Sequence, residues 1–305
     1  MTEGPAATAP PVAAADIPAI VHRLCDDTSM FAPSRVPLAE ALATHVAHSR
    51  SSHRRLIGPL VVAGDRLEEL RRLTANLPSR SLWMALAVPA PSDLGEALRL
   101  ATSIDAVRLA GAEVDLPPAF DPTEVVAAIA AGLDHADVTD TEIYVEVPRD
   151  DRRIAVLDAL ADSDFDANLN FETNGDDPRA GHPVTHPADE ILDAVARHLP
   201  FKVRSGLQHA VSGARGGSEQ YGFLNVFLAV DAARQGVDSE QNGLRDRVTA
   251  VLADRDGESV ARRVRSLGPE RAVAVRSSFT SLGTASITDP LDELIDLGLI
   301  DHEGA

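Results

Sequence analysis

Apolar strand-like segments, each followed by a helical pattern, recur six times between residues 56 and 234 and constrain the fold more than any other feature. Successive units are roughly 22 to 35 residues apart. Units of this size indicate parallel strands joined by right-handed crossovers. The six expected strands are Leu56–Val62, Leu82–Val88, Ala106–Ala110, Ile143–Val147, Ala167–Phe171 and Phe201–Arg204.

The last third of the chain is less regular. Gly243–Leu252, Glu258–Leu267 and Pro290–Leu297 fit helices, whereas Ala272–Ser278 fits a strand or a helix. Six clear units and one or two uncertain ones favour an α/β fold of the (β/α)8 type, a TIM-like barrel that is irregular or incomplete towards its C-terminal end. An open doubly wound parallel sheet is the alternative. The glycine-rich phosphate loop that such sheets often carry is missing after the first expected strand.

The N-terminal region differs from the rest. Residues 1–16 are rich in Ala and Pro and predict a disordered tail, so residues 17–305 form the expected single barrel domain. Ile17–Leu24 and Pro37–His48 fit helices that flank a loop over Cys25–Pro33.

Composition excludes several classes of partner. A net charge of −19 provides no cationic surface for nucleic acid or for an anionic membrane. No apolar run approaches the roughly 20 residues of a membrane-spanning helix. One cysteine, Cys25, excludes an internal disulfide and fits a reducing compartment, so we expect a cytoplasmic protein. A homo-oligomer remains open.

Lys202 is the only lysine among 28 basic residues. A lysine amine can lose its proton when buried and act as a base or nucleophile, whereas a guanidinium cannot. The plainer interpretation is biased composition with one lysine left over. Lys202 nevertheless lies in a short apolar strand that runs into a glycine turn, and it marks a candidate site.

Strand alternation predicts which side chains share the barrel interior, because successive side chains point to opposite faces. Apolar residues on the fourth to sixth expected strands take the helix side, and polar residues take the inner side. Charges inside a barrel are costly unless they are paired or used. The inward set near the carboxyl ends of these strands is Glu146, Asn170, Glu172, Lys202 and Arg204. The alternative to a functional site is a plug of ion pairs that fixes strand register.

This set suits two chemistries. Lys202 can form a Schiff base with a carbonyl while Glu146 or Glu172 moves protons. It can instead attract an anionic substrate whose carboxylate or phosphate Arg204 grips. Ser205 and Gly206 open a small, flexible loop whose amides could cradle an anion.

Weaker candidates flank this set. His209 follows the strand and is a candidate acid or base, although a lone loop histidine is more often merely exposed. Asp26 and Asp27 form an acidic turn that could close over the barrel mouth. We expect no metal and no cofactor, since no histidine, cysteine and carboxylate spacing completes a metal site.

Four segments together resemble a bacterial family of uncharacterised TIM-barrel-like proteins, in which no activity is established. They are Asp26–Pro33 with His45, Phe201–His209, Gly222–Asn225, and Ser281–Ser286 with Asp289 and Pro290. The resemblance implies a barrel. The fifth strand departs from the family pattern, because Asn170–Gly175 replaces a basic segment that ends in glycines. More loosely, a strand lysine followed by Ser-Gly is similar to class I aldolase barrels.

The leading hypothesis is a lyase, aldolase or isomerase acting on a small anionic or carbonyl-containing molecule. Lys202 would be its nucleophile or electrophile, Glu146 and Glu172 its acid and base, and Arg204 its anion clamp. The alternative is a non-catalytic barrel that binds a small ligand or a protein.

Overall fold

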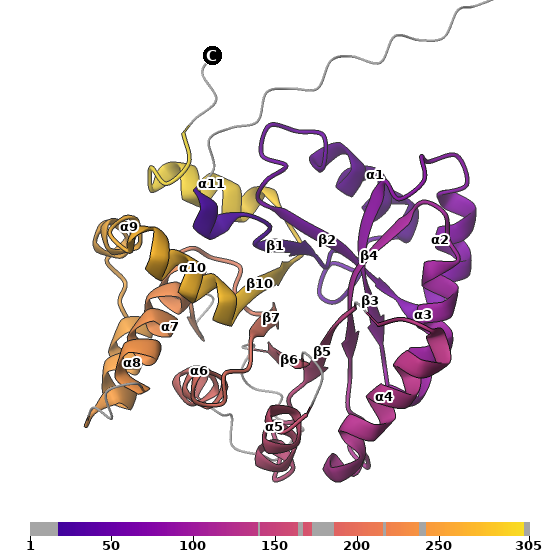
Figure 1. The fold of residues 1–305 in the computed structure, drawn as a ribbon. Coiled ribbons are helices and arrows are strands. Elements are labelled where there is room, and N and C mark those ends of the chain that lie inside the picture. Colours follow the sequence, from indigo (N-terminus) through magenta and orange to yellow (C-terminus); the bar gives the residue numbers. More distant parts are fainter. Residues whose placement is uncertain are drawn as a thin grey trace, which may run out of the picture.

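The computed structural model describes residues 18–139, 141–163, 167–172, 186–215, 218–237 and 242–301. Eight parallel strands close into a barrel in the order β1-β10-β7-β6-β5-β4-β3-β2, with β2 returning to β1 (Figure 1). The strands are β1 (Cys25–Asp27), β2 (Ile57–Ala63), β3 (Leu82–Val88), β4 (Val107–Val114), β5 (Glu142–Glu146), β6 (Ala167–Glu172), β7 (Phe201–Ser205) and β10 (Phe279–Thr284). The prediction of a (β/α)8-type barrel is confirmed, and the open sheet is wrong.

Helices surround the barrel and cover the outer face of its strands (Figure 1). They are α1 (Leu38–His48), α2 (Leu67–Leu73), α3 (Leu94–Thr102), α4 (Val125–Ala136), α5 (Arg153–Ala161), α6 (Pro187–Ala196), α7 (Phe223–Val237), α8 (Leu244–Leu252), α9 (Gly257–Arg265), α10 (Gly268–Ser278) and α11 (Thr288–Asp296). Short 3-10 turns are η1 (Ala19–Val21), η2 (Gly64–Arg66), η3 (Pro91–Asp93) and η4 (Pro122–Glu124). None of the helices within the described ranges has the length and apolar character to cross a bilayer.

All six expected strands are present, but the two strands that close the barrel were not expected. Cys25–Pro33 was predicted to be a loop, yet β1 begins it and pairs with β2 and β10. Ile17–Leu24 was predicted to be a helix, and in the described part of this range, residues 18–24, only the turn η1 forms. Ala272–Ser278 belongs to helix α10, and β10 follows directly. A strand of three residues gives almost no periodicity to detect.

The irregularity expected near the C-terminus lies between β7 and β10. A hairpin of β8 (Gly213–Arg215) and β9 (Ser218–Gln220) is followed there by the four helices α7 to α10. The expected tail of residues 1–16 lies outside the described residues.

The main core lies between the strands and the helices. Leu, Val and Ala dominate it, as the low aromatic content of 4% requires. Its aromatic centre is a stack in which the ring centroids of Phe201 and Phe279 are 5.3 Å apart and those of Phe227 and Phe279 are 5.5 Å apart. This packing fixes the outer faces of β7 and β10, so the alternate residues of both strands must point into the barrel.

Candidate functional site

Lys202 lies at the centre of a buried ion cluster inside the barrel. Its Nζ donates to Asp26 Oδ2 on β1 and to Glu113 Oε1 on β4, both at 2.5 Å. No more than 3% of any of these three side chains is exposed. The cluster therefore joins three strands that are far apart in sequence.

Glu113 is the hub of this cluster, because each of its oxygens accepts hydrogen bonds. Oε2 accepts from Arg204 Nε and from Asn170 Nδ2, both at 3.2 Å. Arg204 also donates to Asp115, just beyond β4. Within the described residues, Asn170 Oδ1 is buried without a hydrogen-bond partner.

A bulge in β4 turns Glu113 into the barrel. The pairing with β3 shifts between Leu109, opposite Met84, and Gly111, opposite Ala85. Ala110 is the extra residue, and a shift of one residue exchanges the two faces of a strand. Without the bulge, Glu113 would face the helices.

The electrostatics keep Lys202 charged. Although burial opposes the ammonium form, the carboxylates of Asp26 and Glu113 raise the pKa of Lys202 above its usual range. Burial likewise favours a neutral Glu113, but Lys202 and Arg204 hold its pKa below the usual value. Burial raises the pKa of Asp26, and Lys202 offsets this only in part. At neutral pH Lys202 is therefore an ammonium, and Asp26 is the carboxylate more ready to take up a proton.

The cluster separates two cavities at opposite ends of the barrel. The upper cavity, of about 520 Å³, lies at the carboxyl ends of the strands, and Glu113 and Arg204 line it. The lower cavity, of about 290 Å³, lies at the amino ends, and Lys202 and Asp26 line it. The carboxyl ends are where barrel enzymes place their active sites.

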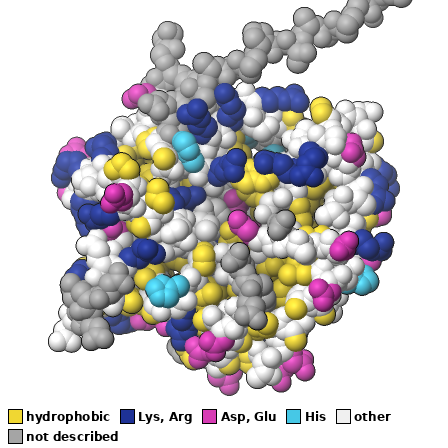
Figure 2. Space-filling model, viewed as in Figure 1, with side chains coloured by type: hydrophobic (Ala, Val, Ile, Leu, Met, Phe, Trp, Pro, Cys, Tyr) yellow, Lys and Arg dark blue, Asp and Glu magenta, His cyan; other side chains and the backbone are white. Residues whose placement is uncertain are grey.

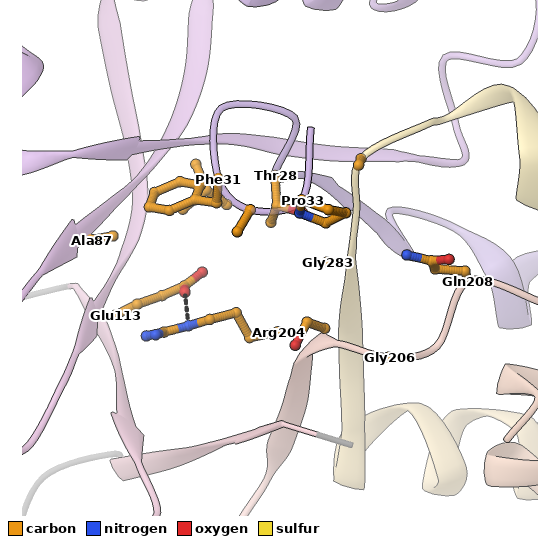
Figure 3. A pocket seen from close by; sticks show the side chains of 13 residues that line it. Thr28, Phe31, Pro33, Ala87, Glu113, Arg204, Gly206, Gln208 and Gly283 are labelled. Atoms are coloured by element: carbon orange, nitrogen blue, oxygen red, sulfur yellow. Dashed lines mark hydrogen bonds and ion pairs between the residues drawn. The ribbon is translucent and has the colours of Figure 1, made fainter. Parts of the chain in front are cut away.

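Figure 3 shows the upper cavity between the loop after β1 and the ends of β4 and β7. Phe31 and Pro33 form an apolar wall opposite the Glu113–Arg204 pair. Ser205 at the end of β7, and Gly206 and Gln208 in the loop after it, add polar groups. An apolar wall facing a few convergent polar groups is typical of a small-molecule site.

The structure brings together most of the expected site residues. Lys202, Arg204, Asn170 and Asp26 belong to the cluster. Ser205 and Gly206 line the upper cavity. The prediction that Lys202 and Arg204 point into the barrel together is confirmed.

The two expected acid–base residues end neighbouring strands. Glu146 ends β5 and is half-buried. Burial lowers the pKa of Arg204, but the carboxylates of Glu113 and Asp115 raise it above its ordinary value, and Glu146 adds a smaller contribution in the same direction. Glu172 ends β6 with its backbone opposite Ser205, but its side chain lies outside the described part.

Two other expected residues point elsewhere. Asp27 accepts from the backbone N–H of Ser29 and lies 3.2 Å from Nδ1 of His45 on α1, so it faces the helix layer. His209 Nδ1 lies 2.6 Å from Glu293 on α11. Alternation explains Asp27, because Asp26 occupies the inner face and its neighbour must take the outer one.

Sequence reasoning missed Glu113, the hub of the cluster, and also Ser281, whose hydroxyl donates to Asp26 at 2.8 Å. The expected third strand stopped at Ala110, where the bulge interrupts alternation. If the strand had been continued to Val114, with alternation starting again at Gly111, Glu113 would have been placed on the inner face of the barrel. Ser281 lies on the unexpected strand β10 and gave no such signal.

No family model, curated protein or solved structure matched this chain in the comparisons with known proteins. The resemblance to the bacterial barrel family therefore stays a prediction, although the barrel that it implied is present. Within the described ranges, no group of three or more His, Cys, Asp and Glu side chains is arranged to hold a metal ion.

Proposed function

We propose that this chain is a cytoplasmic barrel enzyme of the lyase, aldolase or isomerase type, acting on a small anionic or carbonyl-containing substrate in the upper cavity. One observation carries the proposal. A cavity at the carboxyl ends of the strands is lined by Glu113 and Arg204, and the buried ammonium of Lys202 lies directly behind Glu113. Arg204 at the wall of this cavity and the ammonium of Lys202 behind Glu113 are cations held in place, and such groups can stabilise negative charge that develops on a substrate.

The roles follow from how each group is held. Arg204 binds the anionic group of the substrate, since its guanidinium lines the cavity and stays charged. Glu113 is engaged by three donors and has a lowered pKa, so it orients the cations rather than carrying protons. Proton transfer falls to Glu146 and Glu172, at the ends of the adjoining strands.

Lys202 acts in this scheme as a fixed charge that favours an enolate-like intermediate. It borders the lower cavity and is held protonated, so a Schiff base would require it first to pass a proton to Asp26. Its free amine could then attack a carbonyl carbon and release water as the imine forms. The resting geometry favours the electrostatic role.

The test measures exchange of carbon-bound protons next to a carbonyl for solvent deuterium. Proton NMR in D2O monitors this exchange for a panel of small keto acids and sugar phosphates. The wild type should exchange one class of compound, and Arg204→Gln should lower kcat/KM by at least tenfold. Arg271→Gln, which removes a surface ion pair with Asp231, is the matched control and should keep full activity. No exchange with any compound, or equal loss in both variants, would contradict the proposal.

A non-catalytic binding barrel is the second candidate, and complete pairing of Lys202 with two carboxylates favours it. Borohydride trapping with aldehydes and ketones, followed by peptide mapping, separates the two roles of Lys202. An adduct on Lys202 supports the Schiff base. Absence of an adduct, together with full function of Lys202→Arg, excludes it and leaves the electrostatic or the binding role.

A further inference from the structure

The lower cavity has the composition of a second binding site. Trp83 on β3 and Arg23, just before β1, line both this cavity and an adjacent one of about 280 Å³. Arg276 on α10 lines the lower cavity, and Arg108 on β4 lines the adjacent one. Arg23 and Arg108 therefore lie against the single tryptophan of the chain, and Arg276 lines the same lower cavity as Trp83.

These three arginines lack carboxylate partners among the described residues. The guanidinium groups of Arg23 and Arg108 lie 4.7 Å and 5.1 Å from the ring centroid of Trp83. Arg276 donates to the backbone carbonyls of Phe279 and His22, at 2.9 Å and 3.1 Å. Arginines elsewhere on this acidic chain commonly pair with Asp or Glu, as Arg152, Arg197 and Arg271 do.

Arg276 is the most constrained of the three. It is half-buried, and burial lowers its pKa to about 10, with only partial compensation from Asp26. Two backbone carbonyls accept hydrogen bonds from it but do not neutralise its charge. A half-buried cation beside a cavity, with no described carboxylate in direct contact, is costly unless a ligand supplies the charge.

Trp83 orders the side chains of Arg23 and Arg108. A guanidinium attracted to an aromatic face is worth about 0.5–1 kcal/mol at an exposed site. The ring therefore holds Arg23 and Arg108 at the entrance before any ligand arrives. Prior ordering of long side chains reduces the entropy that binding would otherwise cost.

Two carboxylates also face the lower cavity, and their positions decide where an anion can lie. Asp26 is neutralised by Lys202 at the inner end. Glu142 accepts a hydrogen bond of 2.8 Å from the hydroxyl of Tyr144 at the opposite wall. The excess positive charge is therefore at the entrance, around Trp83. Figure 2 shows that basic side chains gather in the upper middle of one face, although the whole chain carries a net charge of −19.

We propose that the lower cavity binds a small organic phosphate where it meets the adjacent cavity at Arg23 and Trp83, with Arg276 on one side of the phosphate and Arg108 on the other. Guanidinium groups recognise phosphate with paired, charge-assisted hydrogen bonds. Three of them suit a dianion better than a single carboxylate. The volume of about 290 Å³ leaves room for a small organic group on the phosphate. This site is separate from the upper cavity and does not depend on the function proposed for it.

The experiment is a titration of the full chain with glycerol 3-phosphate, inorganic phosphate and citrate at fixed ionic strength. Trp83 is the only tryptophan, so its fluorescence reports on this site, and isothermal titration calorimetry measures binding without relying on it. We expect saturable binding of glycerol 3-phosphate that is tighter than that of inorganic phosphate and of citrate. No heat of binding and no fluorescence change would overturn the proposal.

Three variants separate this site from general attraction. Arg23→Gln and Arg108→Gln should each weaken glycerol 3-phosphate at least tenfold, and both side chains are exposed, so folding should be unaffected. Arg72→Gln on α2 removes another exposed arginine that lines neither of these cavities, and it should leave the affinity unchanged. Equal weakening by Arg72→Gln would overturn the proposal, and citrate binding as tightly as glycerol 3-phosphate would overturn the assignment to phosphate. Arg204→Gln should leave this titration intact, which distinguishes the site from the upper cavity.

Discussion

The two ends of the barrel share one ion cluster but treat their arginines differently. At the upper end, Arg204 is neutralised by Glu113 and Asp115. At the lower end, Arg23 and Arg108 meet an aromatic ring, and no carboxylate of the described chain pairs with them. At the upper end, an anionic ligand must share Arg204 with two carboxylates. At the lower end, an anion would meet arginines that no described carboxylate pairs with.

The largest expected effect comes from removing the charge that both ends share. Lys202→Met leaves Asp26 and Glu113 buried without their common partner, and breaking a buried pair in this way costs about 3–5 kcal/mol. Urea unfolding followed by circular dichroism measures the loss. Lys202→Met with Asp26→Asn should recover part of it, because one uncompensated charge is then removed. A loss below about 1 kcal/mol would show that the cluster is not paired as described.

The next effect tests how tightly the upper end is packed. A Cβ added at Gly283 would lie 2.1 Å from the backbone oxygen of Arg204, which cannot move without disturbing β7. Gly283→Ala should cost about 3 kcal/mol and weaken any ligand of the upper cavity. Gly64→Ala is the control, since its nearest neighbour would be 3.4 Å away, and it should cost less than about 1 kcal/mol. Equal costs for the two variants would contradict the close approach of β10 to β7.

A smaller effect appears in the dependence of stability on pH. The pKa of Glu113 is lower in the folded protein than its ordinary value of 4.5, so its contribution to stability is present above about pH 4.5. That contribution is lost as the pH falls through the lower pKa of the folded state. Urea midpoints between pH 6 and pH 3 should fall more steeply for the wild type than for Glu113→Gln. The raised pKa of Asp26 makes its contribution to stability grow as the pH falls, and this applies to both proteins. A urea midpoint that falls more steeply for Glu113→Gln than for the wild type would refute the assignment to Glu113.

The smallest effect on stability is expected at the lower end. Arg108→Gln removes an exposed side chain whose described contact is the ring of Trp83, so the free energy of unfolding should change by no more than about 0.5–1 kcal/mol. Arg204→Gln leaves Glu113 with one donor fewer in the interior and should cost about 2 kcal/mol. Urea unfolding of both variants measures these losses of stability. Equal losses for Arg108→Gln and Arg204→Gln would contradict the difference between the two ends.

Much of the framework could be predicted from the sequence. Six strands were expected where six are found, although the third was ended too early. Alternation in the last two of them placed Lys202 and Arg204 on the inner face of β7 and Asn170 on that of β6. The two short or hidden strands were not predictable in the same way. β1 spans only Cys25–Asp27, and β10 follows helix α10 without a turn signal.

The partners of Lys202 could not be predicted, because both lie on strands that the local sequence pattern does not reveal correctly. Asp26 lies on the strand that was predicted to be a loop, and Asp27 beside it faces away towards His45. Glu113 lies beyond the bulge at Ala110. His209, expected near Lys202, contacts Glu293 on α11 instead.

The sequence by itself determined the repeated strand–helix units, the inner face of β7 and the one lysine upon it, because periodicity and composition are local properties. Tertiary structure alone decided that Lys202 would lie between Asp26 and Glu113, which are 176 and 89 positions away from it in the sequence. Closure of the barrel brings these strands together, and the bulge sets which side chains of β4 point inward. Charge state follows from those contacts, so Lys202 became a protonated partner rather than the free amine that its rarity had suggested.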